Sequence, residues 1–412
     1  MHKIERLLQT LAPKGVEFRK LGEVCEIIRG KRVTKKEILD KGKHPVVSGG
    51  IGFMGYLNEY NREENTITIA QYGTAGFVNW QNQKFWANDV CFSVIPKETL
   101  INRYLYYVLT NMQNYLYSIS NRSAIPYSIS SNNIMQITIP IPPLEIQQEI
   151  VKILDAFTEL NTELNTELKA RKKQYQYYQN MLLDFKDINQ NHKDAKMSAK
   201  PYPKRLKTLL QTLAPKGVEF KKIGELFKRN KGINITAAQM KELHSEIGKV
   251  RIFAGGATKA DINYKDISKK DIINCESVII KSRGNIGFEY YNQPFSHKNE
   301  IWSYSSKTNQ MLVKFLYYYL SNNQDYFQKL AQSSSVKLPQ LSVSDTDEYE
   351  VPIPPLEIQQ EIVKILDQFS LLTTDLLAGI PAEIKARKKQ YEYYREKLLA
   401  FKPLTPHKEV KK

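Results

Sequence analysis

The sequence predicts an α+β protein in which two similar globular domains are separated by two long coiled-coil helices, arranged as a pseudo-two-fold internal repeat. Three observations predict this fold class. Residues 140–155 recur unchanged at 352–367, and residues 7–18 recur unchanged at 209–220. The two copies of each segment lie about two hundred residues apart, so the chain consists of two related halves. After each copy of the longer segment, apolar residues follow at steps of three and four, as a coiled coil requires.

The repeats predict the order of segments along the chain. They are an N-terminal segment (1–15), a globular domain that we call domain 1 (16–142), a first spacer helix (143–185), a linker (186–204), a repeat of the N-terminal segment (205–217), domain 2 (218–354), a second spacer helix (355–402) and a disordered tail (403–412). Within each domain, short strands between glycine turns come first. One helix follows, around 103–117 or 314–327, and then an irregular polar loop, at 121–124 or 332–337.

The first spacer helix should begin near Pro143, because proline suits the first helical turn. Its apolar seam is Ile146, Ile150, Ile153, Phe157, Leu160, Leu164, Leu168, Arg171, Tyr175, Tyr178, Leu182 and Phe185. The extra step of four residues at Leu168 is a stutter that locally unwinds the supercoil. A helix of this length extends about 60 Å.

The second spacer helix repeats the seam from Ile358 to Leu376 and then meets Gly379-Ile380-Pro381. A C-cap glycine followed by a first-turn proline predicts an interruption at this point. The helix should resume around Lys385, where residues 385–391 repeat residues 169–175. Each helix has one apolar seam, so the two are expected to pair with each other.

Composition and charge indicate a cytoplasmic protein with a polyanionic partner. The N-terminus has no apolar signal-peptide core, and no apolar run approaches transmembrane length. The three cysteines, Cys25, Cys91 and Cys275, show no metal-ligand spacing and are expected to be reduced. A net charge of +17 favours nucleic acid as the partner, although a solvated basic surface is the alternative.

The sequence contains no catalytic constellation. The six histidines are scattered, and no phosphate-binding Gly-x-x-x-x-Gly-Lys-Ser/Thr motif occurs. Glu383-Ile384-Lys385 resembles the end of a nuclease motif but lacks an upstream acidic partner. We therefore expect a non-catalytic chain without a metal or cofactor of its own.

Candidate DNA-binding residues cluster around glycine pairs that occur at equivalent places in the two domains. Gly49-Gly50 matches Gly255-Gly256, and both pairs suit tight turns. The nearby loops Gln71-Tyr72-Gly73 and Lys281-Ser282-Arg283-Gly284 differ in identity, as two readers of different bases would, although surface variability would look the same. The candidates are Lys31, Arg32, Ser48, Gln71, Tyr72 and Arg122 in domain 1, and Lys259, Lys281, Arg283 and Lys337 in domain 2.

A basic motif occurs on both spacer helices and is either a DNA-facing stripe or a solvated, partner-docking face. We favour the second interpretation. Since the motif is nearly identical in both copies, it cannot carry a difference in sequence preference. The partner-docking candidates are Lys169, Arg171, Lys172, Lys173, Lys385, Arg387, Lys388 and Lys389.

Together these motifs resemble the specificity subunit of type I restriction-modification enzymes, over essentially the whole chain. The residues that carry the resemblance are the two Pro-Ile-Pro-Pro-Leu-Glu-Ile-Gln-Gln-Glu-Ile segments, the two Ala-Arg-Lys-Lys-Gln-Tyr segments, and Leu-Ala-Gly-Ile-Pro-Ala-Glu-Ile at 377–384. The resemblance implies that domains 1 and 2 are target recognition domains for the halves of a split site in double-stranded DNA. It also implies that the spacer helices pack antiparallel. No individual base contact can be carried over from the family.

The resemblance also implies which partners the chain has. Two copies of a methyltransferase (modification) subunit would dock on the spacer helices, and motor-nuclease (restriction) subunits would join them. S-adenosylmethionine, ATP and magnesium would belong to those partners. A stand-alone DNA-binding regulator with two modules, or a structural adaptor whose charge serves solubility, are the alternatives.

Overall fold

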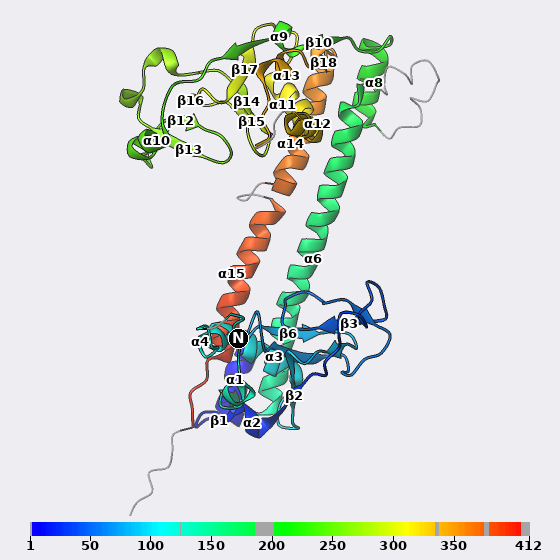
Figure 1. Ribbon diagram of the computed structural model, residues 1–412, viewed down its shortest axis with the longest axis vertical. Helices are drawn as coiled ribbons and strands as arrows, with labels where there is room; N and C mark the ends of the chain where they lie inside the picture. Colours follow the sequence, from blue (N-terminus) through cyan, green and yellow to red (C-terminus); the bar gives the residue numbers. More distant parts are fainter. Residues whose placement is uncertain (1, 124, 186–201, 334–337, 375–378, 405–412) are drawn as a thin grey trace, which may run out of the picture. The chain divides into compact units, whose positions relative to one another are not determined.

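The computed structural model describes residues 2–123, 125–185, 202–333, 338–374 and 379–404. The chain forms two compact units (Figure 1). Unit 1 comprises residues 1–165 and 383–412, and unit 2 comprises residues 166–382. Each unit therefore combines one domain with segments of both spacer helices. Most of the predicted linker and tail lies outside the described residues. No described helix is both long and apolar enough to cross a membrane.

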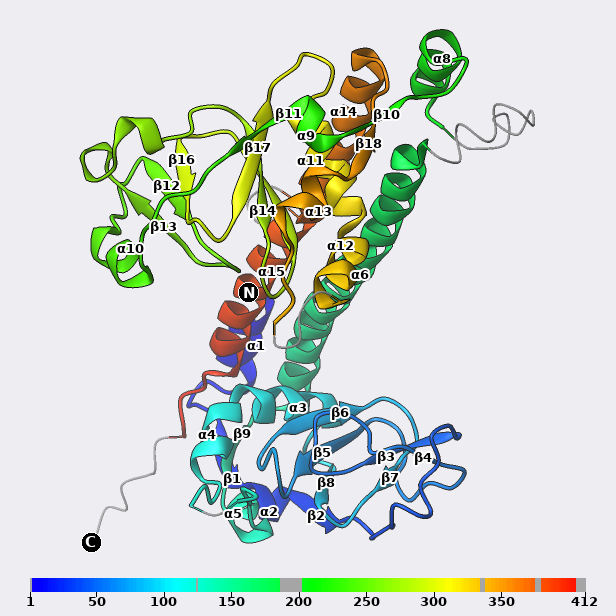
Figure 2. The same cartoon turned by 45° about the horizontal axis from the view of Figure 1, so that its top comes forward.

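Domain 1 is built on a four-stranded antiparallel sheet in the order β2-β8-β5-β6, accompanied by a smaller sheet in the order β4-β3-β7. Helix α3 packs on β5, β6 and β8 of the larger sheet (Figure 2). Strand β1 pairs with β9 in the register Glu17↔Ile141, which joins the two ends of the domain. The elements are α1 (His2–Leu11), β1 (Glu17–Lys20), α2 (Leu21–Val24), β2 (Cys25–Arg29), β3 (His44–Val47), β4 (Tyr56–Leu57), β5 (Thr66–Ala70), β6 (Val78–Gln81), β7 (Trp86–Ala87), β8 (Cys91–Pro96), α3 (Asn102–Asn111), α4 (Gln113–Ser118), α5 (Ser131–Met135) and β9 (Thr138–Ile141).

Domain 2 repeats this topology, with sheets in the orders β11-β17-β14-β15 and β13-β12-β16, and with β10 paired to β18. The predicted internal repeat is therefore confirmed at the level of the fold. The elements are α8 (Lys204–Leu213), β10 (Phe220–Lys222), α9 (Ile223–Leu226), β11 (Phe227–Asn230), α10 (Ala237–Leu243), β12 (Val250–Phe253), β13 (Lys259–Ile262), two 3₁₀ turns (Tyr264–Asp266 and Lys269–Asp271), β14 (Ser277–Lys281), β15 (Gly287–Tyr291), β16 (Phe295–His297), β17 (Trp302–Ser306), α11 (Val313–Asn322), α12 (Gln324–Ser333), α13 (Val343–Asp347) and β18 (Glu350–Pro352).

The single helix predicted late in each domain is wrong, because the structure has two helices there. Helix α3 ends before Met112, whose backbone leaves helical geometry, and α4 starts at Gln113. The Gln113 side chain donates to the carbonyl of Gly76 at 2.7 Å and accepts from the amide of Val78 at 3.0 Å. In domain 2, Gln324 likewise donates to the carbonyl of Ile286. These bonds to the sheet turn compete with the continuation of one straight helix.

The first spacer helix, α6 (Leu144–Leu183), is continuous as predicted. In unit 1 its Phe157 stacks on Tyr394 of α15 (Ile380–Leu399), with ring centroids 5.5 Å apart. In unit 2 its Tyr178 stacks on Phe369 of α14 (Leu356–Thr374), at 5.1 Å. Within each unit the paired helices run antiparallel (Figure 1). The predicted pairing of the two spacer helices is thus confirmed at the seam positions Phe157 and Tyr178.

One detail of the spacer prediction is wrong. Arg171 was placed on the seam, but its side chain is exposed and forms an ion pair with Glu167 at 3.5 Å, because a guanidinium would lose hydration in an apolar interface. Gly379 directly precedes α15 and is itself not helical, so the predicted break at this glycine is confirmed. Its predicted C-cap role depends on residues 375–378, which lie outside the described part of the chain.

Identical buried contacts fix each domain on its spacer helix. The side chain of Gln147, fully buried, accepts from the amide of Ile101 at 2.8 Å and donates to the carbonyls of Thr99 and Pro142. Gln359 makes the equivalent bonds to Leu312, Gln310 and Pro354.

A second pair of contacts adds to this attachment. Tyr107 donates to Asp155 of α6, and Tyr318 donates to Asp367 of α14. The recurrence of residues 140–155 at 352–367 therefore has a physical reason, since these residues carry the attachment of each domain to its helix.

Candidate nucleic-acid interface

Three loops of domain 1 meet beside the ends of β3 and β5. They comprise residues 48–55, 71–76 and 121–129, with residue 124 outside the described part of the chain. The carbonyl of Gly49 accepts from the Thr74 hydroxyl at 2.7 Å, which ties the first loop to the second. The amide of Gly73 donates to the carbonyl of Tyr127, and that of Ile129 to the carbonyl of Gln71, which ties the second loop to the third. The three loops therefore form one hydrogen-bonded surface.

Asn88 connects a fourth loop to this surface. Its buried side-chain oxygen accepts from the backbone amide of Val33 at 3.2 Å, and its backbone amide donates to the carbonyl of Val47. The loop at residues 30–33, which follows β2, is thereby held next to the start of the loop at 48–55. The side chain and the backbone of Asn88 together therefore keep both loops in place, since buried polar groups are hydrogen-bonded.

Domain 2 assembles the equivalent loops with different contacts. The amide of Gly284 donates to the carbonyl of Pro339 at 2.9 Å, and that of Leu341 to the carbonyl of Ser282. Ser282 donates from its hydroxyl to the carbonyl of Glu300, whose carboxylate accepts from the amide of Gly255. The loop at 282–284 is therefore bonded directly to the loop at 338–341, and Glu300 links it to the loop at 255–259.

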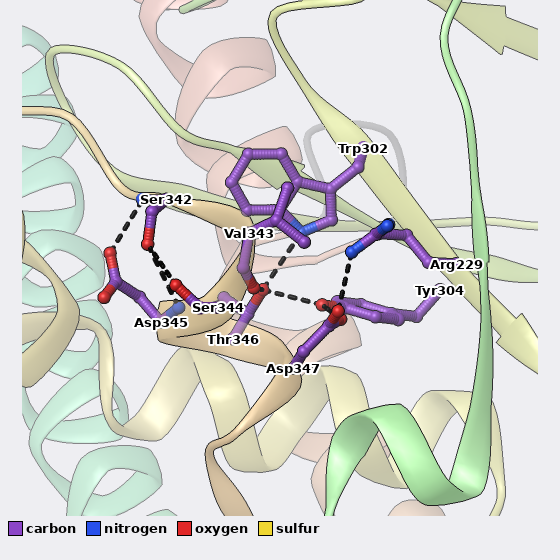
Figure 3. A network of polar contacts seen from close by, with 9 residues as sticks. All are labelled: Arg229, Trp302, Tyr304, Ser342, Val343, Ser344, Asp345, Thr346 and Asp347. Carbon is purple, nitrogen blue, oxygen red and sulfur yellow. Dashed lines mark hydrogen bonds and ion pairs between the residues drawn. The ribbon is translucent and has the colours of Figure 1, made fainter.

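A polar network fixes the segment that follows the loop at 338–341 (Figure 3). Asp347 of α13 accepts from Arg229 of β11 at 2.6 Å and from the hydroxyl of Tyr304 of β17 at 2.5 Å. The indole of Trp302 donates to the hydroxyl of Thr346 at 3.0 Å. Ser342 and Asp345 form a capping box at the start of α13. The sheet and α13 are thus locked together beside the candidate loops.

The structure brings together four of the predicted residues in domain 1. Ser48, Gln71, Tyr72 and Arg122 all lie in the three joined loops. The Arg122 guanidinium is exposed and lies over the ring of Tyr127 at 5.4 Å. The remaining pair, Lys31 and Arg32, is exposed on the fourth loop.

The predicted residues of domain 2 differ in exposure and in whether their charge is paired with a carboxylate. Arg283 is exposed in the loop that bridges to Gln340, and Lys259 is exposed at the start of β13. Lys281, in contrast, is half-buried and forms an ion pair with Glu289 at 2.6 Å, so its charge is already matched. Lys337 lies outside the described residues.

The partner-docking candidates lie on exposed faces of the spacer helices, except that Arg387 is only half-exposed. On α6, Lys169, Lys173 and Tyr177 follow one another at steps of four residues and so share a face. On α15, Lys385, Lys389 and Tyr393 repeat this stripe. The tyrosines are 54% and 52% exposed, respectively. Arg171 and Arg387 pair with the glutamates four residues before them, whereas Lys172 and Lys388 are exposed.

The buried titratable groups suit structural roles. Burial raises the pKa of the Cys25 and Cys91 thiols to about 12, so neither provides a thiolate near neutral pH. Burial lowers the pKa of His297, which therefore stays neutral. Among the residues that the structure describes, no cluster of three or more His, Cys, Asp or Glu side chains could hold a metal ion.

Two features of this surface were not predicted from the sequence. The first is the pair Ile51 and Phe53, whose side chains are exposed at the tip of the loop at 48–55. Ile51 lies between two glycines and Phe53 follows the second, in Gly50-Ile51-Gly52-Phe53. This pattern could have predicted their exposure, because a glycine-rich turn exposes its side chains. The connecting role of Asn88 depends on tertiary contacts, and no local pattern could have shown it.

The chain is basic, and it has two domains of one fold that expose different loops and are attached to paired helices. These features define a DNA-binding protein with two recognition modules. The sequence matches the profile of the Type I restriction modification DNA specificity domain over residues 13–174 and 215–386. This chain therefore belongs to the family of type I restriction-modification specificity subunits, which recognise bipartite DNA targets.

Individual relatives and solved structures agree with this assignment. A Haemophilus influenzae protein named as a type I restriction enzyme specificity subunit is 32% identical, with 97% of this chain and 98% of the relative covered. An Escherichia coli type I restriction enzyme specificity subunit is 28% identical, with 98% of each chain covered. The crystal structure of the S subunit of a type I restriction-modification system from M. genitalium has the same fold, with a TM-score of 0.63, 19% identity, and 93% and 95% of the two chains covered.

Proposed function

We propose that this chain selects the DNA sequence for a type I restriction-modification complex and directs methylation and cleavage by partner subunits. Domain 1 reads one half of a split site and domain 2 reads the other. The observation that carries the proposal is the contrast between the identical attachments at Gln147 and Gln359 and the different residues of the equivalent loops at Gln71-Tyr72-Gly73 and Lys281-Ser282-Arg283-Gly284. The identical attachments suit one kind of protein partner that binds twice. The different exposed loops suit the recognition of two different base sequences.

The proposed base contacts come from the joined loops. In domain 1, Gln71 and Arg122 supply an amide and a guanidinium, and both groups can bond to base edges. Lys31 and Arg32 on the neighbouring loop suit phosphate contacts, which set affinity and its salt dependence. In domain 2, Arg283 is the exposed guanidinium next to the glycine turn and takes the role of base reader, whereas Lys259 suits phosphate.

The proposed partners are two methyltransferase subunits, together with motor-nuclease subunits. S-adenosylmethionine, ATP and magnesium would be bound by those partners, where the chemistry takes place. The lysine and tyrosine stripes on α6 and α15 support docking of the same subunit twice, because each stripe repeats residue types, spacing and exposure. Exposed tyrosines are typical of protein interfaces.

Purification of the tagged chain from the cells that encode it tests the proposal. We expect a DNA methyltransferase to co-purify with two copies per chain, and the complex to transfer labelled methyl groups from S-adenosylmethionine to DNA. Combining Lys169→Glu with Lys385→Glu should remove the methyltransferase. The matched control combines Lys152→Glu with Lys364→Glu, exposed equivalents outside the stripes. Specific DNA binding without any methyltransferase would favour the regulator instead, a function that none of the matches supports.

A further inference from the structure

The loop at residues 48–55 exposes large apolar side chains. Ile51 is 67% exposed, Phe53 47% and Met54 38%. They are separated and flanked by glycines, in Gly49-Gly50-Ile51-Gly52-Phe53-Met54-Gly55. Contiguous exposed apolar side chains on a folded protein mark a site of interaction.

Both ends of this loop are fixed to the domain. At one end, the backbone of Gly49 approaches the Tyr72 carbonyl so closely that an added Cβ would lie 2.2 Å from its oxygen. At the other end, the Met54 amide donates to the carbonyl of Val46 at 2.9 Å. A small cavity lies between the loop and the side chains of Thr68 in β5 and Asn79 in β6. The apolar tip is therefore presented above the sheet in a defined position.

The loop adjoins the candidate DNA contacts of domain 1. Thr74, from the loop that carries Gln71, donates to Gly49 through both its hydroxyl and its amide. The same loop is bonded to Tyr127, over which the Arg122 guanidinium lies. Polar and cationic groups therefore border the apolar tip, an arrangement typical of proteins that insert apolar side chains into DNA.

Domain 2 lacks an equivalent of the apolar tip. Its counterpart, residues 254–258, reads Ala-Gly-Gly-Ala-Thr and is closed by a hydrogen bond from the amide of Ala254 to the carbonyl of Thr258 at 3.0 Å. A protein partner that binds both halves alike would need the same surface twice. The described residues 254–258 carry no large apolar side chain, so the occupant of this loop surface differs between the halves, as the two half-sites of the DNA do.

We propose that Ile51 and Phe53 form an apolar wedge that enters the base stack of the half-site bound by domain 1. The wedge partly unstacks one base-pair step and bends the duplex there, whereas domain 2 binds its half-site without such an insertion. The insertion rests on the proposed DNA-binding function. It adds specificity without base contacts, because pyrimidine–purine steps unstack and kink most easily.

Duplexes with 2-aminopurine at successive positions test the wedge. The probe carries the methylated sequence read from the genome of cells that contain the complex, and the protein is the full complex with its modification subunits. We expect binding to raise the fluorescence at one step of one half-site and at no position of the other. Combining Ile51→Ser with Phe53→Ser should abolish the rise and lower affinity about tenfold, with an unchanged salt slope because no phosphate contact is lost. Ile247→Ser, at an 80% exposed isoleucine of domain 2, is the matched control.

The outcomes separate the wedge from the proposed function. Normal specific binding without a fluorescence change at any position overturns the wedge and leaves the function intact. Failure of the wild-type complex to bind the methylated sequence specifically overturns the proposed function itself. Loss of the modification subunits from the doubly substituted protein, with DNA binding by the chain unchanged, makes the loop a protein-docking site and also overturns the wedge.

Discussion

At the scale of single residues, the environment of each side chain decides which of the many basic groups can meet DNA. Lys281 ends β14 and Arg283 lies two residues further on, in the following loop, but Lys281 is paired with Glu289 at 2.6 Å, whereas Arg283 is exposed. A cation that already has a carboxylate partner gains less from a phosphate or a base edge. Net charge alone therefore overstates the number of groups that bind DNA.

Arg283→Ala should cost on the order of 1 to 3 kcal/mol of specific binding and relax discrimination at one position, if the guanidinium makes a bidentate base contact. Binding to the target and to single-base variants of it measures both effects. The control is Lys249→Ala, an exposed cation at the opposite end of β12 from Gly255. Equal weakening on all sequences with a smaller salt slope would identify a phosphate contact instead.

His297 should make domain 2 sensitive to acid. Burial lowers its pKa in the folded state below the usual 6.5, so the unfolded chain binds a proton first. The contribution of neutral His297 to the free energy of unfolding is therefore complete above about pH 6.5 and is lost as the pH falls toward the folded-state pKa. The melting temperatures of the wild type and of His297→Gln at pH 7.5 and 5.5 check this prediction. Between the two pH values, the melting temperature of the wild type should fall further than that of His297→Gln. Equal losses would show that other groups set the acid response.

At the scale of elements, each spacer helix is both a support for its domain and part of the coiled coil. Gln147 and Gln359 are fully buried and bond with three backbone groups each, so the first turn of each helix is tied to its domain. Further along, the same helices expose the lysine and tyrosine stripes. One sequence segment thus carries two kinds of contact at different positions along its length.

Gln147→Ala should destabilise the attachment of domain 1 by about 1 to 3 kcal/mol, because it leaves buried backbone groups unpaired. Hydrogen exchange in α3 and β9 measures the local effect, which is appropriate for a chain with more than one cooperative unit. Gln148→Ala is the matched control, since that neighbouring side chain is exposed. Similar protection in both variants would rule out the buried glutamine as an attachment point.

The repeat at residues 158–169 should act as a ruler. Thr158-Glu159-Leu160-Asn161 is followed by two similar units, all within α6, and the boundary between the compact units falls after residue 165. Removing residues 162–165 shortens the helix by about 6 Å and turns the seam by only about 40°. That length corresponds to roughly one or two base pairs of DNA.

Methylome sequencing in cells that carry this deletion measures the result. We expect both half-sites to be kept and the unspecified gap between them to shorten. An unchanged gap with intact methylation would rule out the ruler. The matched control combines Thr162→Ala with Asn165→Ala, two exposed positions of the same unit. It preserves the length of the helix and Leu164 of the seam, and it should leave the gap unchanged.

At the scale of the whole molecule, the two domains are modules closed by their own terminal strands. Strand β1 pairs with β9, and β10 pairs with β18, so each domain leaves the scaffold and returns to it at one place. The two largest clusters of buried apolar side chains also lie one in each unit. Recognition by one domain should therefore be separable from recognition by the other.

Exchange of residues 16–142 for the domain of a relative should change one half-site and leave the other unchanged. Sequencing of methylated sites in cells with the chimaera checks this prediction. A chimaera with residues 218–354 exchanged is the reciprocal control and should change the opposite half. Alteration of both halves by either exchange would contradict independent reading.

The sequence by itself determined the internal repeat, the paired spacer helices with their break before Ile380, and the family, because identical segments and apolar periodicity are local signals. The tertiary structure decided which charges are free, as Lys281 and Arg283 show, and which loops lie together, as Gly49, Thr74 and Tyr127 show. It also divided the helix expected at 103–117, since Gln113 bonds to a sheet turn distant in the sequence. Such outcomes depend on contacts between distant residues, and local propensity contains no information about them.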